Sequence, residues 1–201
     1  MTFWTDVADW NHTAGVPLRP TPGWVNQADL DLAYRLVEEE RDELATALRE
    51  RDMIETADAI ADGLWVRAGL LLRLGLARDY IDLITPSPHP PTWEELPDAA
   101  METVIDELHA TDNRLRRAIH ARNLIDTDVL GHRGMYQLSA LAVLLRIPLD
   151  RVWAEVARSN FAKFVDGKVI RRDDGKILKP ADWTPPDIRG ALQVEAVQWG
   201  R

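Results

Sequence analysis

Apolar residues recur every three or four positions along most of the chain, which is the spacing of amphipathic helices. The first long stretch of this kind follows Trp24, where Asn26 or Asp29 can cap a helix whose apolar positions continue to Leu48. The next helix is predicted from about Met53 to Leu76 and carries apolar side chains on most of its faces. We therefore expect this second helix to lie at the centre of the core.

Prolines and glycines divide the rest of the chain. Those before Trp24 predict a short helix followed by an extended arm. After a proline-rich break, a solvated helical pair is expected over about 94–122, and residues 126–128 are expected to form a turn. Two more helices are predicted over about 135–145 and 149–164. The fold class predicted from these elements is all-α, a helical bundle.

The C-terminal region departs from the helical pattern. Residues 173–175, with the sequence Asp-Asp-Gly, lie between two β-prone runs at 168–170 and 176–178. This order is a hairpin signal. Since prolines follow, we expect a small C-terminal hairpin or a loop tail rather than another large element.

The composition fits one globular domain. Of 201 residues, 46% are hydrophobic and 28% are charged, which is enough apolar material for one core, so a single domain over residues 1–201 is expected. The chain has no cysteine, which excludes disulfides, a thiolate nucleophile and cysteine-bound zinc. Any metal must therefore be held by oxygen or imidazole ligands.

Charge and hydropathy limit the partners and the location. A net charge of −9 argues against a binder of nucleic-acid polymers, because phosphate contacts need a basic face. No uncharged apolar run approaches the roughly 20 residues that cross a bilayer, so no membrane partner is expected. The first residues lack the basic stretch and apolar core of a secretory signal. We therefore expect a cytoplasmic location.

Carboxylates interrupt the apolar face of the first long helix. With 100° between successive residues, Glu40 falls inside the apolar arc and Glu43 at its border. Glu38 and Asp42 fall on the opposite side. Ionised carboxylates belong in water, so those that face the core are the informative ones.

The central helix repeats this anomaly, because Asp58 and Asp62 lie one turn apart on one face. Two antiparallel helices with such inward carboxylates can surround a hard divalent cation, for which Mg²⁺ or Mn²⁺ is the natural candidate. In the alternative interpretation, Glu39 and Glu43 point to solvent, and Asp58 caps a helix or pairs with an arginine.

The acidic helices resemble a known family. Residues 36–44 contain Glu39-Glu40 followed by Glu43, and residues 57–66 contain a second acidic run. This order is similar to the EExxE helix and the following ExxD helix of the MazG-like, phosphoribosyl-ATP pyrophosphohydrolase-like all-α nucleotide pyrophosphohydrolases.

The tail extends the resemblance to the phage and bacterial branch of that superfamily. Its similar stretches are residues 155–163, 174–180 and 185–188. Altogether the resemblance covers roughly residues 7 to 78 and 148 to 188, and the ordered combination is more specific than any one motif.

Two departures from the family pattern are visible. Ala59 stands three residues before Asp62, where ExxD has a glutamate, so the partner carboxylate must be Asp58 or Glu55. Residues 79–147 have no counterpart in the compact members of the family and are predicted to be a helical insertion. Two short matches between residues 72–74 and 145–147 do not establish an internal repeat.

The resemblance implies an activity and roles for the acidic residues. The activity is metal-dependent cleavage of a nucleoside or deoxynucleoside triphosphate into its monophosphate and pyrophosphate. By the same resemblance, Glu40, Glu43 and Asp62 are expected metal ligands, with Asp58 as the fourth. Glu39 is expected to be either a ligand or the base that orients water, and the resemblance leaves this choice open.

The resemblance also implies substrate contacts and assembly. Asn160 and Lys163 match nucleotide-contacting positions of the family, and Lys176 and Lys179 are expected to contact phosphates, unless they are ordinary surface lysines. A homodimer or a homotetramer is the assembly expected from the family.

Two other functions remain open at this stage. A non-catalytic helical protein could use the same scaffold for oligomerisation or binding, as the missing ExxD glutamate allows. Alternatively, the enzyme could act on a nucleotide sugar or a modified nucleotide. Trp65 or Trp183 could stack on a base, although most of the eight tryptophans are expected in the core.

Overall fold

The computed structural model describes residues 3–78, 86–173 and 177–193. Within these ranges the chain is all-helical, as predicted, apart from isolated β-bridges. The seven helices are α1 (Phe3–Thr13), α2 (Gln27–Glu50), α3 (Met53–Arg73), α4 (Asp98–His120), α5 (Leu124–Leu144), α6 (Leu149–Phe161) and α7 (Ile188–Leu192).

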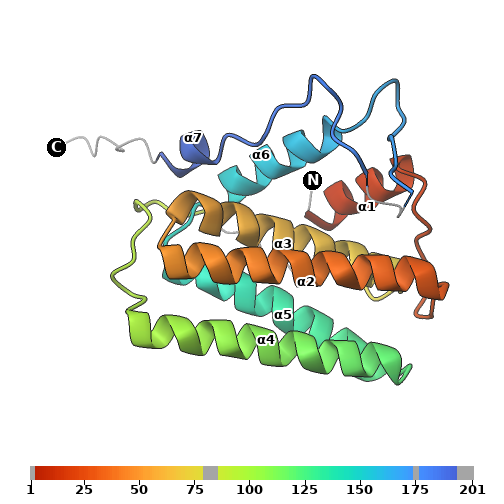
Figure 1. Ribbon diagram of the computed structural model, residues 1–201, viewed down its shortest axis with the longest axis horizontal. Coiled ribbons are helices and arrows are strands. Elements are labelled where there is room, and N and C mark those ends of the chain that lie inside the picture. Colours follow the sequence, from red (N-terminus) through yellow and green to blue (C-terminus); the bar gives the residue numbers. More distant parts are fainter. Residues whose placement is uncertain (1–2, 79–85, 174–176, 194–201) are drawn as a thin grey trace.

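The helices are arranged in three layers (Figure 1). The antiparallel hairpin of α2 and α3 forms the middle layer, α4 and α5 lie on one side of it, and α1, α6 and α7 lie on the other. Helix α3 packs against α1, α2, α5, α6 and α7, and most of its residues are buried. The prediction that the second long helix occupies the centre of the core is confirmed.

Local capping sets the ends of the central hairpin. Asn26 accepts a hydrogen bond from the backbone N–H of Asp29 and caps α2. Arg51 then takes a left-handed conformation with φ of 52°, and the side chain of Asp52 accepts from the backbone N–H of Ile54 at the start of α3. The chain therefore reverses over two residues and brings α2 and α3 side by side.

Two predictions about the helices after the proline-rich break were wrong. The region predicted as a helical pair over 94–122 contains one long helix, α4, and residues 126–128 form the first turn of α5 instead of a separate turn. Asn123 caps α5 by accepting from the backbone N–H of Asp126. Because Asp126 is also favourable near a helix N-terminus, the acidic run starts the helix about ten residues before the predicted start at 135.

The hairpin of α4 and α5 repeats the hairpin of α2 and α3 with a constant spacing of 71 residues. Arg122 corresponds to Arg51, and both have φ of 52° between their two helices. Asn123 corresponds to Asp52, and each caps the second helix of its hairpin.

The repeat continues to the end of each second helix. Gly75 and Arg146 both have positive φ there, at 67° and 57°. Thr56 and Thr127 are both fully buried at the start of the second helix. The chain therefore contains an internal repeat that the two short sequence matches were insufficient to establish.

Close helix packing and a buried ion pair join the two hairpins. A Cβ added to Gly131 of α5 would lie 2.7 Å from Leu71 of α3, so glycine permits the approach of these helices. Arg67 of α3 donates to Asp112 of α4 over 2.6 Å in the core, and the Tyr34 hydroxyl of α2 donates to the backbone carbonyl of Asp112. Helix α4 is thus fixed by polar contacts to both middle-layer helices.

The C-terminal region partly matches its prediction. Antiparallel bridges join Val165 to Lys168 and Arg171 to Ile177, and the remainder to α7 is irregular. The turn predicted at 173–175 falls largely on residues 174–176, which lie outside the described residues. Together with α1 and α6, this tail covers the face of the middle layer opposite α4 and α5.

No helix in the described part combines the length and apolar character needed to span a bilayer.

Candidate active site

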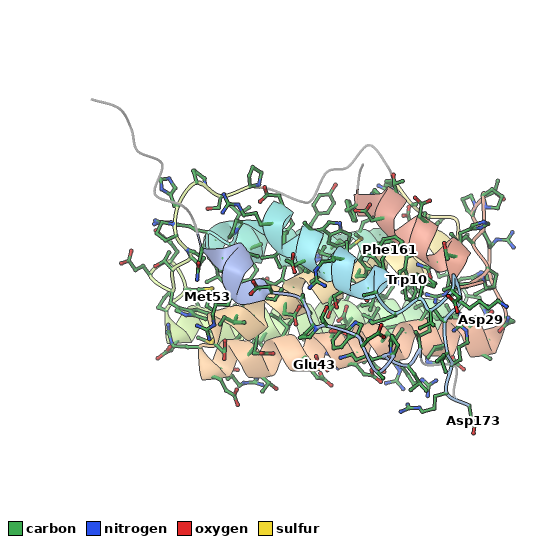
Figure 2. All side chains as sticks on the ribbon, turned by 90° about the horizontal axis from the view of Figure 1, so that it is seen from above. Trp10, Asp29, Glu43, Met53, Phe161 and Asp173 are labelled. Carbon is green, nitrogen blue, oxygen red and sulfur yellow. The ribbon has the colours of Figure 1, made fainter. Side chains whose placement is uncertain are left out.

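The predicted acidic residues project from the middle layer toward the α1, α6 and tail side. Glu40 of α2 and Asp58 and Asp62 of α3 are partly buried there, whereas Glu39 and Glu43 are exposed at the rim. Figure 2 views the molecule from this side and shows Glu43 on α2. We refer to these five carboxylates as the acidic cluster.

Helical register separates the acidic cluster from the neighbouring acidic residues. Glu38 lies 3.6 Å from Arg116 of α4. Asp42 lies 2.8 Å from Arg41 and 3.7 Å from His109 of α4. Glu38 and Asp42 therefore face the opposite layer, on the side that the helical projection predicts.

Burial and repulsion within the acidic cluster act together at Glu40. Burial, followed by the charges of Asp62, Glu43 and Asp58, raises the pKa of Glu40 to about 8. A glutamate with this pKa holds a proton at neutral pH unless positive charge is supplied. The cluster therefore carries more negative charge than its surroundings neutralise.

The pKa values of the two aspartates of α3, Asp58 and Asp62, are raised as well. Burial, followed by the charges of Asp62 and Glu55, raises the pKa of Asp58 to about 7. Burial raises the pKa of Asp62 to about 6, although the positive charge of Lys163 opposes this rise. Asp62 is thus the better compensated of the two.

The residues present fit a hard divalent cation. All metal-binding atoms of the acidic cluster are carboxylate oxygens, and Asp58 Oδ1 is enclosed without a hydrogen-bond partner in the part of the chain that the structure describes. Among the described residues, no three acidic or histidine side chains already converge as a ready-made metal site. Mg²⁺ commonly keeps waters and takes further oxygens from substrate phosphates, so a few carboxylates can suffice to hold it.

Asn160 and Lys163, at the end of α6, lie against the acidic cluster. The Asn160 amide donates to Asp62, and Lys163 Nζ donates to Asn160 Oδ1 over 2.6 Å. Trp10 of α1 donates its indole N–H to the Asn160 backbone carbonyl over 2.9 Å. Helices α1 and α6 therefore place an amide and a cation above the α3 carboxylate.

Two clefts meet at Asp62, Asn160 and Lys163. The first cleft has a volume of about 160 Å³ and runs between α1, α2, α3, α6 and the tail. The second has a volume of about 240 Å³ and is lined by Asp58 and by Lys179 of the tail. One elongated ligand can therefore reach both clefts across the same three side chains.

Of the two tail lysines predicted to contact phosphates, the structure describes Lys179. Lys179 Nζ lies 3.9 Å from the centre of the Trp183 ring, and its charge lowers the pKa of Asp58 and Asp62, although burial dominates and raises both. Lys176 lies outside the described residues. Trp183 lines the second cleft and Trp65 the first, so both tryptophans considered for stacking lie beside the clefts.

The second hairpin does not repeat the acidic cluster. The positions that follow Glu39, Glu40, Glu43, Asp58 and Asp62 by 71 residues are Ala110, Thr111, Arg114, Val129 and Arg133. Two of the five carboxylates are replaced by arginines, so this hairpin cannot provide the same cation site. The repeat therefore carries the acidic cluster on one of its two copies.

Comparison with known families divides the chain into the same two repeats. The family model described as phosphoribosyl-ATP pyrophosphohydrolase matches residues 11–84 and again residues 77–160. The chain belongs to the phosphoribosyl-ATP pyrophosphohydrolase family. Its first match contains the acidic cluster and its second contains the α4 and α5 hairpin, so the pyrophosphohydrolase fold is repeated within one chain. No curated protein and no solved structure gives a match.

Sequence reasoning missed two polar residues of the first cleft. Asn11 of α1 and Arg73 of α3 both line it, on the side away from Lys179. The signal for Arg73 was its charge on an otherwise apolar helix. Asn11 carried no signal, because a single asparagine in a short helix has no distinguishing pattern.

Proposed function

We propose that this protein is a metal-dependent nucleotide pyrophosphohydrolase that cleaves a nucleoside or deoxynucleoside triphosphate into its monophosphate and pyrophosphate. Membership of the family supports the general part of this proposal, which is pyrophosphohydrolase activity. The observation that carries the finer part is the acidic cluster, whose partly buried members raise one another's pKa beside Lys163.

Cation binding follows from this charge imbalance. Glu40, Glu43, Asp58 and Asp62 would hold Mg²⁺ or Mn²⁺, which neutralises phosphate oxygens and lowers the pKa of bound water. Lys163 would hold a phosphate oxygen at the junction of the two clefts, and Asn160 would keep Asp62 oriented through their hydrogen bond. The proposed ligands are thus divided between α2 and α3.

The bond change is hydrolysis of a phosphoanhydride. An oxygen of water forms a new bond to phosphorus, the bridging bond between the α- and β-phosphates breaks, and pyrophosphate leaves. The proton of the attacking water passes to a carboxylate of the acidic cluster. Glu39, at the rim, is either that base or an additional ligand.

The two clefts suggest an orientation for the substrate. The nucleoside would occupy the first cleft, where Leu36, Trp65 and Val66 supply apolar walls. The pyrophosphate would occupy the second cleft, near Lys179. This orientation places the scissile bond beside Asp62, which lines both clefts.

The experiment is a substrate panel with separate product detection. Canonical and modified triphosphates, diphosphates and nucleotide sugars are incubated with Mg²⁺ or Mn²⁺, and nucleotides are separated while phosphate and pyrophosphate are measured independently. We expect pyrophosphate in step with monophosphate, abolished by a chelator and by Asp62→Asn. Release of inorganic phosphate or of tripolyphosphate would mean that a different bond is attacked.

A non-catalytic scaffold is the competing function. Its support is Ala59, which stands at the ExxD glutamate position. A folded protein that binds metal and turns over none of the panel would favour this function.

We also propose a homodimer or a homotetramer. Four large apolar side chains of α5 are 48% to 76% exposed and are available for contact with a second copy, namely Ile125, Val129, Tyr136 and Val143. Closed symmetric assemblies bury such patches. Light scattering of an active preparation should give a mass well above the 22.8 kDa of one chain, and a monomer mass would refute the assembly.

A further inference from the structure

The first cleft contains a second polar group, separate from the acidic cluster. Arg73 and Asn11 line this cleft and are 8% and 2% exposed. Both surround Gly69: a Cβ placed there would lie 3.4 Å from Arg73 Nη1 and 3.7 Å from Asn11 Nδ2. The guanidinium and the amide are therefore neighbours on the part of the cleft wall that Gly69 forms.

Arg73 lacks an acceptor within the described part of the chain. Its guanidinium makes no hydrogen bond and no ion pair there, and its nitrogens open into the cleft. Burial lowers the pKa of Arg73 to about 10, with Asp29 opposing and Arg171 adding to this change, so the side chain stays charged at neutral pH. A buried guanidinium with five N–H donors is costly unless a ligand supplies acceptors.

Asn11 adds an acceptor to these donors. Its Nδ2 donates to the backbone carbonyl of Val7 over 2.7 Å, which fixes the orientation of the amide. Its Oδ1 makes no hydrogen bond with the described part of the chain. The pair therefore offers a fork of donors next to one acceptor.

The distance from the acidic cluster suits a nucleoside. Asp62 and Gly69 both line the first cleft, and seven residues of helix separate them by about 10 Å along α3. This length is close to the span from the α-phosphate of a nucleotide to the outer edge of its base. The wall between them is apolar, with Trp65 and Val66 on α3 and Leu36 on α2.

We propose that Arg73 and Asn11 read the outer edge of the nucleobase and select a purine with a carbonyl oxygen at C6, guanine or hypoxanthine, over adenine. This inference rests on the proposed function. Such a base presents O6 and N7 as acceptors to an arginine fork, and its N1–H can donate to the asparagine oxygen. Adenine would turn its amino donor toward the donors of Arg73.

The walls of the first cleft, rather than the charges near Arg73, favour a neutral acceptor over a second anion. Asp29 and Arg171 both lie close enough to interact with Arg73, and their opposite charges act on it in opposite directions. The apolar walls favour a flat base over a solvated anionic group. A base carbonyl satisfies the donors without adding charge.

The test compares ITP with ATP, because these nucleotides differ only at the C6 oxygen or amino group and the adjacent N1 proton. For the wild type, kcat/KM for pyrophosphate release should favour ITP by roughly tenfold to a hundredfold. Arg73→Met should bring this ratio close to one, and Arg73→Lys, which keeps the charge without the fork, should give an intermediate ratio. The control Arg35→Met, at an exposed position of α2, should leave the ratio unchanged.

A binding measurement separates this inference from the proposed function. Calorimetry with IMP and AMP needs no turnover, and the wild type should bind IMP more tightly with a preference that Arg73→Met or Arg73→Lys reduces. Equal binding of IMP and AMP, or turnover of ATP that matches ITP, would overturn the base assignment while leaving pyrophosphate release intact. Preferential IMP binding without any hydrolysis would support the base assignment and overturn the proposed reaction.

Discussion

Arg67 of α3 and Asp112 of α4 form an ion pair with an Nη2 to Oδ2 distance of 2.6 Å and side chains only 2% and 1% exposed. The pair joins the two hairpins of the repeat inside the core. Arg67 Nε and Asp112 Oδ1 are buried and have no hydrogen-bond partner among the described residues. Each charge therefore depends on the other for compensation.

Removing one member of this pair should destabilise the fold strongly. Asp112→Asn leaves the Arg67 charge buried without its counter-charge, and we expect a loss of about 3–5 kcal/mol in the free energy of unfolding. Urea denaturation followed by circular dichroism measures this loss.

The double variant Arg67→Met with Asp112→Leu is the matched comparison. It removes both charges and should lose less stability than Asp112→Asn alone. If the single and double variants were equally destabilised, uncompensated charge would not be the cause.

Divalent metal should stabilise the wild type through the acidic cluster. Mg²⁺ or Mn²⁺ is expected to raise the melting temperature of the wild type much more than that of Asp62→Asn or Glu40→Gln, because ligand-linked stabilisation requires an intact site. Differential scanning fluorimetry with and without a chelator measures this shift. Equal shifts in all three proteins would refute the site.

The helical register supplies controls for the metal experiment. Glu38→Gln and Asp42→Asn change carboxylates that face α4, so both variants should retain the metal-dependent shift and the activity. Glu40→Gln should reduce kcat/KM by about a hundredfold or more, because it removes a proposed metal ligand. Comparable losses in the control variants would show that the opposite helix face carries the chemistry.

The metal-free protein should lose stability at the acidic cluster as the pH rises. The pKa of Glu40 is raised from its ordinary 4.5 to about 8 in the folded protein, so the native state binds more protons than the unfolded state between these values. The contribution of Glu40 is therefore full below about pH 4.5 and lost by about pH 8. The charges that act on it, from Asp62, Glu43, Asp58 and Glu39, reinforce this direction.

Unfolding titrations of the wild type and Glu40→Gln across pH 4.5 to 8 isolate this contribution. The wild type should lose stability relative to the variant as the pH rises, and saturating Mg²⁺ should reduce the difference. A wild type that gained stability relative to Glu40→Gln over this range would contradict the raised pKa.

The two left-handed positions at the ends of the hairpins should respond differently to substitution. A Cβ at Gly75 would lie 2.2 Å from the backbone oxygen of Thr21, so Gly75→Ala combines a clash with backbone strain and should cost more than about 1 kcal/mol. At the equivalent position, Arg146 already has φ of 57° and forms an exposed ion pair with Glu95. Arg146→Gly should change stability by less than about 1 kcal/mol, because the relief of strain offsets the lost pair. Thermal unfolding of both variants tests the contrast, and equal losses would contradict it.

The central hairpin and the orientation of its carboxylates could be predicted from local pattern alone. Helical periodicity fixes which residues share a face, so the separation of Glu40 from Glu38 required no knowledge of the neighbouring helices. The caps at Asn26 and Asp52 are equally local, because their partners lie two or three residues away. The prediction of a turn at residues 126–128 failed because a turn and a capped helix start have the same composition. The helix that follows decides between them.

What the sequence by itself determined is therefore the all-α class, the two acidic helix faces and the family resemblance, since each depends on order and spacing along the chain. Only the tertiary structure decided that Asn11 meets Arg73, that Arg67 meets Asp112, and that α4 and α5 repeat the central hairpin without its carboxylates. The physical reason is that helix periodicity sets the direction of a side chain around its own axis. The residues that it meets are set by how apolar faces from distant parts of the chain pack together.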